Sequence, residues 1–166
     1  MDEATDRLGL PLLAAGQAQK EVFHNEALAL LDLAVQACVV AVGRDTPPTS
    51  PAFGQCWIVG STPAGPWAGH TCSLAGWTQG GWRFVAPWPG MSAWDQASSQ
   101  LVRFDGGTWS TGPVSGDRLM IDGVQVVGPR QPAVARPAGG ATVDVEARAA
   151  IAEMLATLAS HGLIAA

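Results

Sequence analysis

Gln79-Gly80-Gly81 separates Trp77-Thr78 from Trp82-Arg83-Phe84-Val85 near the middle of the chain. Aromatic and β-branched residues favour strands, and glycine adopts the positive φ that tight turns require, so this stretch predicts a β-hairpin. Two later glycine turns, Asp105-Gly106-Gly107 and Asp122-Gly123, also lie between apolar runs and predict two more hairpins. The three hairpins together predict a meander or compact barrel of antiparallel strands, not a βαβ fold.

All seven tryptophans of the chain lie within this hairpin-rich tract. The flat apolar face and the N–H donor of an indole suit contact with a sugar ring, but a small β module also needs large side chains for its core. Three tryptophans lie within strand patterns and are expected in the core: Trp57, Trp82 and Trp109. Three others lie in loops rich in glycine and proline, where exposure is more plausible, and are the candidates for glycan contact: Trp67, Trp88 and Trp94.

A helical pattern precedes the tryptophan-rich tract. Apolar residues recur at three- and four-residue steps, which predicts a helix over Ala15–Val40 with one wide apolar stripe. Gly43 and the Pro47-Pro48 pair end the pattern, because proline cannot continue a helix. The apolar stripe supplies the first part of an expected oligomer interface: Val22, Leu30 and Leu31.

A second helical pattern ends the chain. Asp144 is the expected N-cap and Gly162 the expected stop. Apolar residues follow steps of four, three and four, the spacing of a short coiled coil: Ala147, Ile151, Met154 and Leu158. A helix this short pairs weakly alone, so it needs a neighbouring subunit or the rest of the fold. Ile151, Met154 and Leu158 complete the expected oligomer interface.

These patterns predict an α+β protein: an N-terminal helix, a small module rich in antiparallel hairpins, and a C-terminal helix in an oligomeric bundle. The segments expected are an anchoring or oligomerising segment (1–46), a Trp/Gly-rich β module (52–128), a Pro/Gly linker (129–143) and a helix (144–166).

The composition restricts the class of protein. Of 166 residues, 48% are hydrophobic and 14% are charged, whereas about a quarter are charged in a typical domain. Low charge leaves less surface that must face water and favours burial against partners. The net charge of −5, without a basic run, argues against nucleic-acid binding. We expect no membrane span, and the acidic N-terminus has the wrong charge for a signal peptide.

Motifs for catalysis or metal binding do not emerge. His24, His70 and His161 lie in separate segments without metal-ligand spacing, and there is no GxSxG or phosphate-binding motif. We therefore expect no enzyme activity, catalytic residue, metal or cofactor. The three cysteines are odd in number and lack a CxxC pair, so free buried thiols are expected, although Cys56 and Cys72 remain a conceivable pair.

Several stretches together resemble a known family. They are Leu10-Pro11-Leu12-Leu13-Ala14-Ala15-Gly16-Gln17-Ala18-Gln19-Lys20-Glu21-Val22, His24-Asn25-Glu26-Ala27-Leu28, Gly81-Trp82-Arg83-Phe84, Phe104-Asp105-Gly106-Gly107-Thr108-Trp109 and Val127-Gly128-Pro129-Arg130-Gln131-Pro132-Ala133. The resemblance is to a domain-of-unknown-function family of tail-fibre and head-spike proteins in alphaproteobacterial prophages and gene transfer agents. It implies no catalytic residues.

The resemblance implies a virion or particle appendage. Together with the low charge and the apolar helices, it leads us to expect a structural subunit of a phage-like particle that joins the particle to a fibre and supports attachment to host cells. Such a subunit is made in the bacterial cytoplasm and resides on the particle surface. Its partners are further copies of itself and other particle proteins, namely capsid, spike or fibre subunits. The alternative is a glycan-binding module that recognises host capsule or surface polysaccharide. Exposed tryptophans in the loops favour the alternative. Buried tryptophans, together with subunit contacts by both helices, favour the structural role.

Overall fold

The computed structural model describes residues 4–14, 16, 20–112, 114 and 116–165. The chain divides into two compact units, Met1–Pro113 (unit 1) and Val114–Ala166 (unit 2). Helix and strand both occur, which confirms an α+β protein. The division between the units falls after residue 113, within the predicted β module (52–128). Among the described residues, no helix is both long and apolar enough to cross a membrane.

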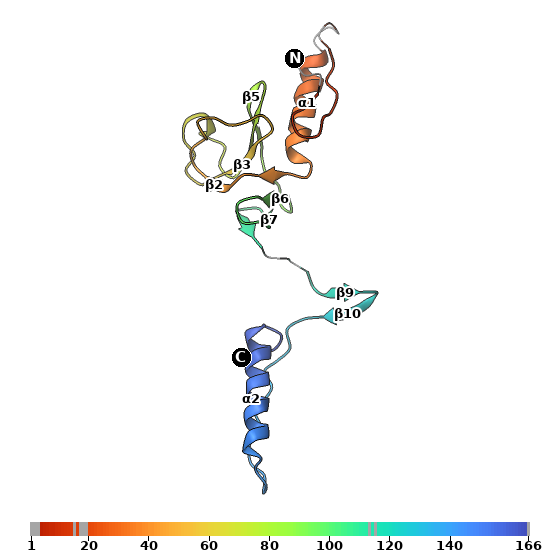
Figure 1. The fold of residues 1–166 in the computed structure, drawn as a ribbon, viewed down its shortest axis with the longest axis vertical. Coiled ribbons are helices and arrows are strands. Elements are labelled where there is room, and N and C mark those ends of the chain that lie inside the picture. The colour runs from red at the N-terminus through yellow and green to blue at the C-terminus, as the bar shows by residue number, and fades with distance from the viewer. Residues whose placement is uncertain (1–3, 15, 17–19, 113, 115, 166) are drawn as a thin grey trace. The chain divides into compact units, whose positions relative to one another are not determined.

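The described residues of unit 1 form one α-helix, a 3-10 turn and two four-stranded sheets (Figure 1). In chain order its elements are α1 (Lys20–Ala34), β1 (Cys38–Val39), β2 (Val42–Arg44), β3 (Cys56–Val59), η1 (Gly65–Trp67), β4 (Leu74–Thr78), β5 (Gly81–Val85), β6 (Ser92–Asp95), β7 (Gln100–Phe104) and β8 (Trp109–Thr111). One sheet has the order β2-β3-β4-β5 and the other β1-β6-β7-β8.

The hairpins of unit 1 form where the glycine turns predict them. β4 and β5 pair in antiparallel register from Leu74↔Val85 to Thr78↔Gly81, and Gly81 has a φ of 94°. β7 and β8 pair in the same way around the Asp105-Gly106-Gly107 turn. The predicted strand positions are therefore confirmed.

The predicted all-antiparallel meander is wrong in one respect. β1 pairs with β6 and β2 with β3 in parallel. These two short strands are separated only by Val40 and Ala41, so one stretch of chain enters both sheets in succession. Its backbone also bonds to β3, since Val40 N donates to Cys56 O and Ile58 N donates to Ala41 O. This segment divides the strands into two sheets joined by a shared edge segment.

The N-terminal helix is shorter than the predicted Ala15–Val40. Helix α1 ends at Ala34, Gln36 takes a φ of 50°, and Val39 is buried in a strand. Ala15 lies outside the described residues. The helix stops because Arg7 binds its C-terminal carbonyls: the guanidinium donates to the oxygens of Asp32, Leu33, Val35 and Gln36. β-branched Val39 and Val40 then favour strand over helix.

The main core of unit 1 lies between the two sheets and α1. It is formed by buried residues from all three: Leu33, Ala37, Val39, Cys56, Ile58, Leu74, Met91, Ala93, Val102 and Phe104. Leu33 packs so closely on β4 that a Cβ at Gly76 would collide with its side chain. All three cysteines are free, and burial raises the pKa of Cys56 to about 11. Cys38 and Cys72 are only partly buried, so the expectation of buried thiols is met by Cys56 alone.

A second core of tryptophans covers the other face of the β2-β3-β4-β5 sheet. Strand β3 is buried on both faces, because Cys56 and Ile58 enter the main core while Trp57 and Val59 enter this one. The rings of Trp57 and Trp67 lie 6.2 Å apart, and Trp67 meets Trp82 edge-on at 5.2 Å. Such tilted and edge-on pairs suit the quadrupoles of aromatic rings.

Unit 2 contains strands β9 (Leu119–Ile121) and β10 (Val124–Val127) and helix α2 (Val145–Ser160). The strands form the predicted hairpin, with Asp122 and Gly123 at φ values of 49° and 76°. Positive φ at both positions is the geometry of a type I′ turn. Asp144 caps α2 as predicted, accepting from Ala147 N at 2.8 Å, and Gly162 follows the helix with a φ of 73°.

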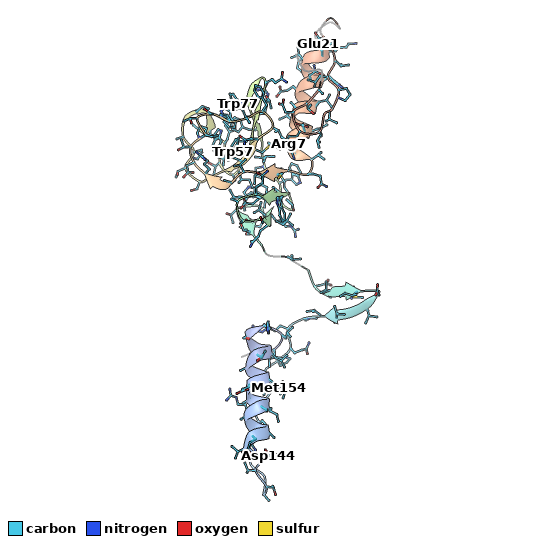
Figure 2. All side chains as sticks on the ribbon, in the orientation of Figure 1. Arg7, Glu21, Trp57, Trp77, Asp144 and Met154 are labelled. Carbon is cyan, nitrogen blue, oxygen red and sulfur yellow. The ribbon has the colours of Figure 1, made fainter. Side chains whose placement is uncertain are left out.

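The Pro/Gly linker of unit 2 folds back along α2. At one end, Gln131 N donates to Leu163 O at 2.9 Å and Arg130 Nε donates to Ile164 O at 2.9 Å. At the other end, Arg148 donates to Gly139 O. On α2, Ile151 is half-buried, whereas Met154, labelled in Figure 2, is exposed.

Candidate functional site

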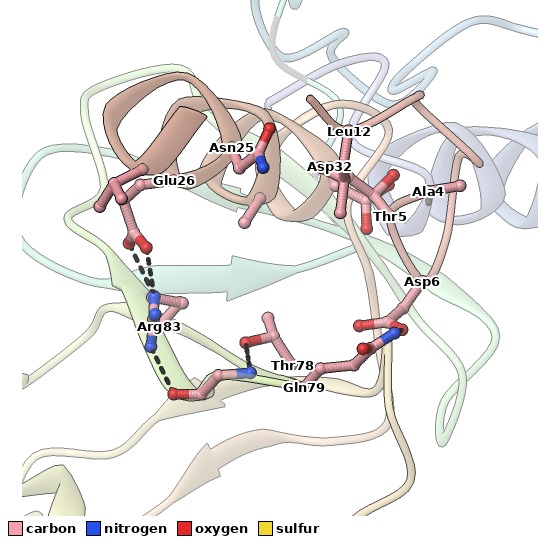
Figure 3. A pocket seen from close by; sticks show the side chains of 13 residues that line it. Ala4, Thr5, Asp6, Leu12, Asn25, Glu26, Asp32, Thr78, Gln79 and Arg83 are labelled. Atoms are coloured by element: carbon pink, nitrogen blue, oxygen red, sulfur yellow. Dashed lines mark hydrogen bonds and ion pairs between the residues drawn. The ribbon is translucent and has the colours of Figure 1, made fainter. Parts of the chain in front are cut away.

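A cleft of about 200 Å³ lies between α1, the N-terminal segment and the β4–β5 hairpin (Figure 3). Across it, Arg83 Nε lies 2.7 Å from Glu26 Oε1. The same guanidinium donates through Nη1 to Gly80 O at 3.0 Å and Trp82 O at 3.1 Å. Arg83 therefore ties the hairpin turn to the helix.

The N-terminal segment is held to α1 on the other side of the cleft. The buried Asp32 carboxylate accepts from Thr5 Oγ1 at 2.8 Å, Arg7 N at 3.1 Å and Leu8 N at 2.6 Å. Asn25 exchanges two hydrogen bonds with the backbone of Leu13, at 2.9 and 3.0 Å. Each of these polar side chains has an internal partner. We call the bonds made by Asp32, Asn25 and the Arg83–Glu26 pair the polar lock. The carboxylates of Asp32 and Glu26 already bond within the protein, so we interpret the polar lock as a structural feature that fixes the N-terminal segment.

The expectation for Trp67 is contradicted. Its side chain is 0% exposed, because the Gly65-Pro66-Trp67 stretch forms the turn η1 over the sheet and directs the indole into the tryptophan core. A loop rich in glycine and proline here covers a core instead of displaying a side chain. Trp57 is buried as expected, whereas Trp82 and Trp109 are half-buried and pack against the cores.

Trp88 and Trp94 are exposed, at 52% and 46% of their surface. Trp88 lies in the turn before Met91, whose N–H donates to Trp88 O at 2.9 Å. Trp94 lies within strand β6 and not in a loop, so its exposure has a different cause. It belongs to the outer face of a sheet whose inner face is in the main core.

The register of β6 and β7 gathers side chains around Trp94. Ala93 and Val102 are opposite each other and face the core, so their neighbours face outward. Trp94 is paired with Leu101, which is 50% exposed, and Ser92 is paired with Arg103. Leu101, Ser92 and Arg103 were not among the predicted site residues. Of the three, only Arg103 has a local signal, because it lies between apolar Val102 and Phe104.

A shallow hollow of about 490 Å³ lies beside the Trp94 ring. Its lining is Gln36, Ala37, Ser92, Ala93, Trp94 and Leu101. The backbone closes one side, where Trp94 N donates to Ala37 O at 2.8 Å. An aromatic face beside small residues, with an amide and a hydroxyl at the margin, can stack a sugar ring and bond its hydroxyls. Trp88 and Trp67 do not line this hollow.

Trp88 lies near a different turn. Gly90 N donates to Phe104 O, which places the Trp88 loop next to the Asp105-Gly106-Gly107 turn. Asp105 accepts from the backbone N–H groups of Thr108 and Gly107, both at 2.8 Å, and these bonds hold the pKa of its carboxyl below its ordinary value. Asp105 is thus explained as a turn residue.

The predicted interface residues divide between the two helices. On α1, Leu31 is 50% exposed and Leu30 is half-buried, while Val22 is 60% exposed but borders the polar lock. On α2, Met154 and Leu158 are 57% and 38% exposed, and no residue of the helix is buried. The exposed stripe of α1 also includes Phe23, at 81%.

Metal-binding clusters are absent from the part of the chain that the structure describes. The His70 ring stacks on Phe84 at 3.6 Å with a 5° tilt, so it belongs to the packing beside the tryptophan core.

Residues 24–110, just over half of the chain, match the model of a family described as "Protein of unknown function (DUF2793)". The matched residues lie within unit 1. No curated protein matches the chain significantly.

Proposed function

The chain belongs to the DUF2793 family, and we propose that it is a non-enzymatic structural subunit of a spike or fibre on a phage-like particle, either a gene transfer agent or a prophage. In this role it joins the particle to a fibre and supports attachment to host cells. Its partners are copies of itself and other particle proteins, and it resides on the particle surface.

One observation carries this proposal: unit 1 has closed cores, whereas α2 and the β9–β10 hairpin of unit 2 have no buried residue. A segment with regular secondary structure and no core of its own gains stability from partners. One part that folds on itself and another that offers apolar surface suit an adaptor between larger components. The choice of a phage-like particle as the assembly rests on the sequence resemblance to spike and fibre proteins.

Deletion of the gene tests this role. We expect particles lacking the protein to assemble and package normally but to attach poorly to host cells, because an appendage decorates a finished shell. Attachment is measured as the fraction of particles removed by host cells, and assembly by electron microscopy. Failure to form particles at all contradicts the appendage role, and so does normal attachment.

The second candidate function is recognition of host capsule or surface polysaccharide, favoured by the hollow beside Trp94. Trp94→Ala removes the stacking face, and Trp88→Ala is a matched control because it removes an equally exposed indole outside the hollow. We expect Trp94→Ala to weaken polysaccharide binding about tenfold, and Trp88→Ala to leave it unchanged. Binding that survives Trp94→Ala contradicts a site in this hollow and leaves the adaptor role.

A further inference from the structure

We propose that one face of the β9–β10 hairpin is a self-association surface that packs against the same face of a second copy of this chain. The inference deepens the proposed function, since it names a partner and the surface that binds it. Its test is the oligomeric state of the purified chain, so it can fail while the attachment role holds, and the reverse.

The register of the hairpin places four aliphatic side chains on one face. Ile121 is opposite Val124, and Leu119 is opposite Val127. Met120 and Gln125 are opposite each other on the other face, and Val126 lies at the register shift. The four aliphatic residues of the first face are between 42% and 65% exposed. We call Leu119, Ile121, Val124 and Val127 the aliphatic face.

This face is unusual for a strand pair in water. Six of the seven strand residues are apolar, and all seven are exposed. An isolated two-stranded hairpin is marginally stable at best, and it gains stability when a third strand, a helix or another sheet covers it. Contiguous exposed apolar surface on a folded unit is a usual mark of an interaction site.

The charges around the hairpin favour a second copy as the occupant. The two strands carry no charge, so the aliphatic face matches itself. Asp122 occupies the tip, while the open end is flanked by Arg118, Arg130 and Asp117. The tip is therefore negative by one charge and the base positive by one. When two hairpins pack face to face in opposite directions, each tip lies over the partner's base, and the charges are complementary at both ends.

The remaining charges of unit 2 do not oppose this contact. From Val114 to Ala166 there are five acidic residues (Asp117, Asp122, Asp144, Glu146 and Glu153) and four arginines (Arg118, Arg130, Arg136 and Arg148), which gives a net charge of −1. The Asp117–Arg118 pair at the base is loose, at 3.8 Å, and both side chains are largely exposed. Long-range repulsion between two copies of unit 2 is therefore small.

The size of the face sets the strength that we expect. Four aliphatic side chains with about half of each exposed, plus the neighbouring strand backbone, offer on the order of 400 Å² per copy, which is the range of weak, transient contacts. The hairpin alone thus predicts reversible association of the pure protein at high concentration. In a particle, where copies are held close together, the same contact is reinforced by high effective concentration.

Analytical ultracentrifugation of the full chain across a concentration series tests the proposal. We expect a reversible monomer–dimer equilibrium that Ile121→Ser with Val124→Ser abolishes, since this pair forms the half of the aliphatic face next to the turn. Met120→Ser with Gln125→Ser is the matched control, because it changes the opposite face of the same hairpin. Asp122→Asn removes the tip charge in a residue that tolerates positive φ, and we expect it to weaken association several-fold.

A second measurement on the unmodified protein guards against a variant that merely unfolds the hairpin. Hydrogen exchange at residues 119–127 should slow as protein concentration rises, because association covers these amides. A monomer at every concentration overturns the proposal. Association that persists in the Ile121→Ser/Val124→Ser protein also overturns it and directs attention to α2. Exchange that is independent of concentration overturns it as well, and favours a different particle protein as the occupant.

Discussion

The two units of this protein use apolar residues in opposite ways. In unit 1, the apolar side chains of two sheets and a helix close over one another, and residues such as Leu33, Leu74 and Val102 are 0% exposed. Among the described residues of unit 2, Ile164 is the one buried apolar side chain. Valine and leucine occur in both units, but all seven tryptophans and all four phenylalanines belong to unit 1. The difference therefore lies both in topology and in the large aromatic side chains that unit 1 has for its cores.

The exposed apolar side chains are unevenly distributed. Most of the large ones lie in unit 2 or on α1. The family match covers unit 1 only. The partners in the proposed function would supply the packing that unit 2 does not provide for itself.

The substitution with the largest expected effect tests the contrast between the two units by removing the most buried tryptophan, Trp67. Trp67→Ala leaves a large cavity in the tryptophan core, and we expect it to lower the free energy of unfolding by about 3–5 kcal/mol. Trp88→Ala is the control, because it removes an indole that is 52% exposed, and we expect a change within about 0.5 kcal/mol. Urea unfolding followed by tryptophan fluorescence measures both. Equal effects of the two substitutions contradict the division between core and surface tryptophans.

Much of the fold could be predicted from local sequence. The glycine turns at Gly80-Gly81, Gly106-Gly107 and Asp122-Gly123 act through their own φ angles, so short stretches identify each hairpin. Asp144 and Gly162 likewise define α2 locally. The parallel pairs of β1 and β2 could not be predicted, because they depend on partners far along the chain and on strands of only two and three residues.

The candidate site was predicted less well, for a physical reason. Proline and glycine around Trp67 indicate a turn but do not say whether the turn lies over a core or in solvent. Trp94 was assigned to a loop, and its strand became visible only through pairing with Leu101. The contribution of Arg7 to ending α1 was also missed, because a helix terminus bound by a distant side chain leaves no local signal.

A second substitution tests whether unit 1 depends on its polar lock as well as on its apolar core. Asp32→Ala leaves the N–H groups of Arg7 and Leu8 without their buried acceptor, and we expect it to lower the free energy of unfolding by about 2–3 kcal/mol. The N-terminal segment should also become more sensitive to protease. Asp117→Ala is the matched control, because this carboxylate in unit 2 is 85% exposed. If Asp32→Ala leaves the free energy of unfolding unchanged, the N-terminal segment is held by apolar contacts alone.

The substitution with the smallest expected effect, Asp144→Ala, tests the same contrast in unit 2. Asp144→Ala removes the side chain that caps α2, and the loss of an N-cap costs about 1 kcal/mol. Because no residue of α2 is buried, little tertiary packing compensates, and the dilute protein should lose helical circular dichroism. The unfolding midpoint of unit 1 should not move, since Asp144 belongs to the other unit. Asp144→Ser keeps a capping oxygen and should retain the helix.

If a higher protein concentration restores the helix of Asp144→Ala, then association supplies the stability that the N-cap supplied before. If the substitution instead shifts the unfolding of unit 1, the two units are energetically coupled, and the contrast between a self-sufficient body and a partner-dependent extension is wrong.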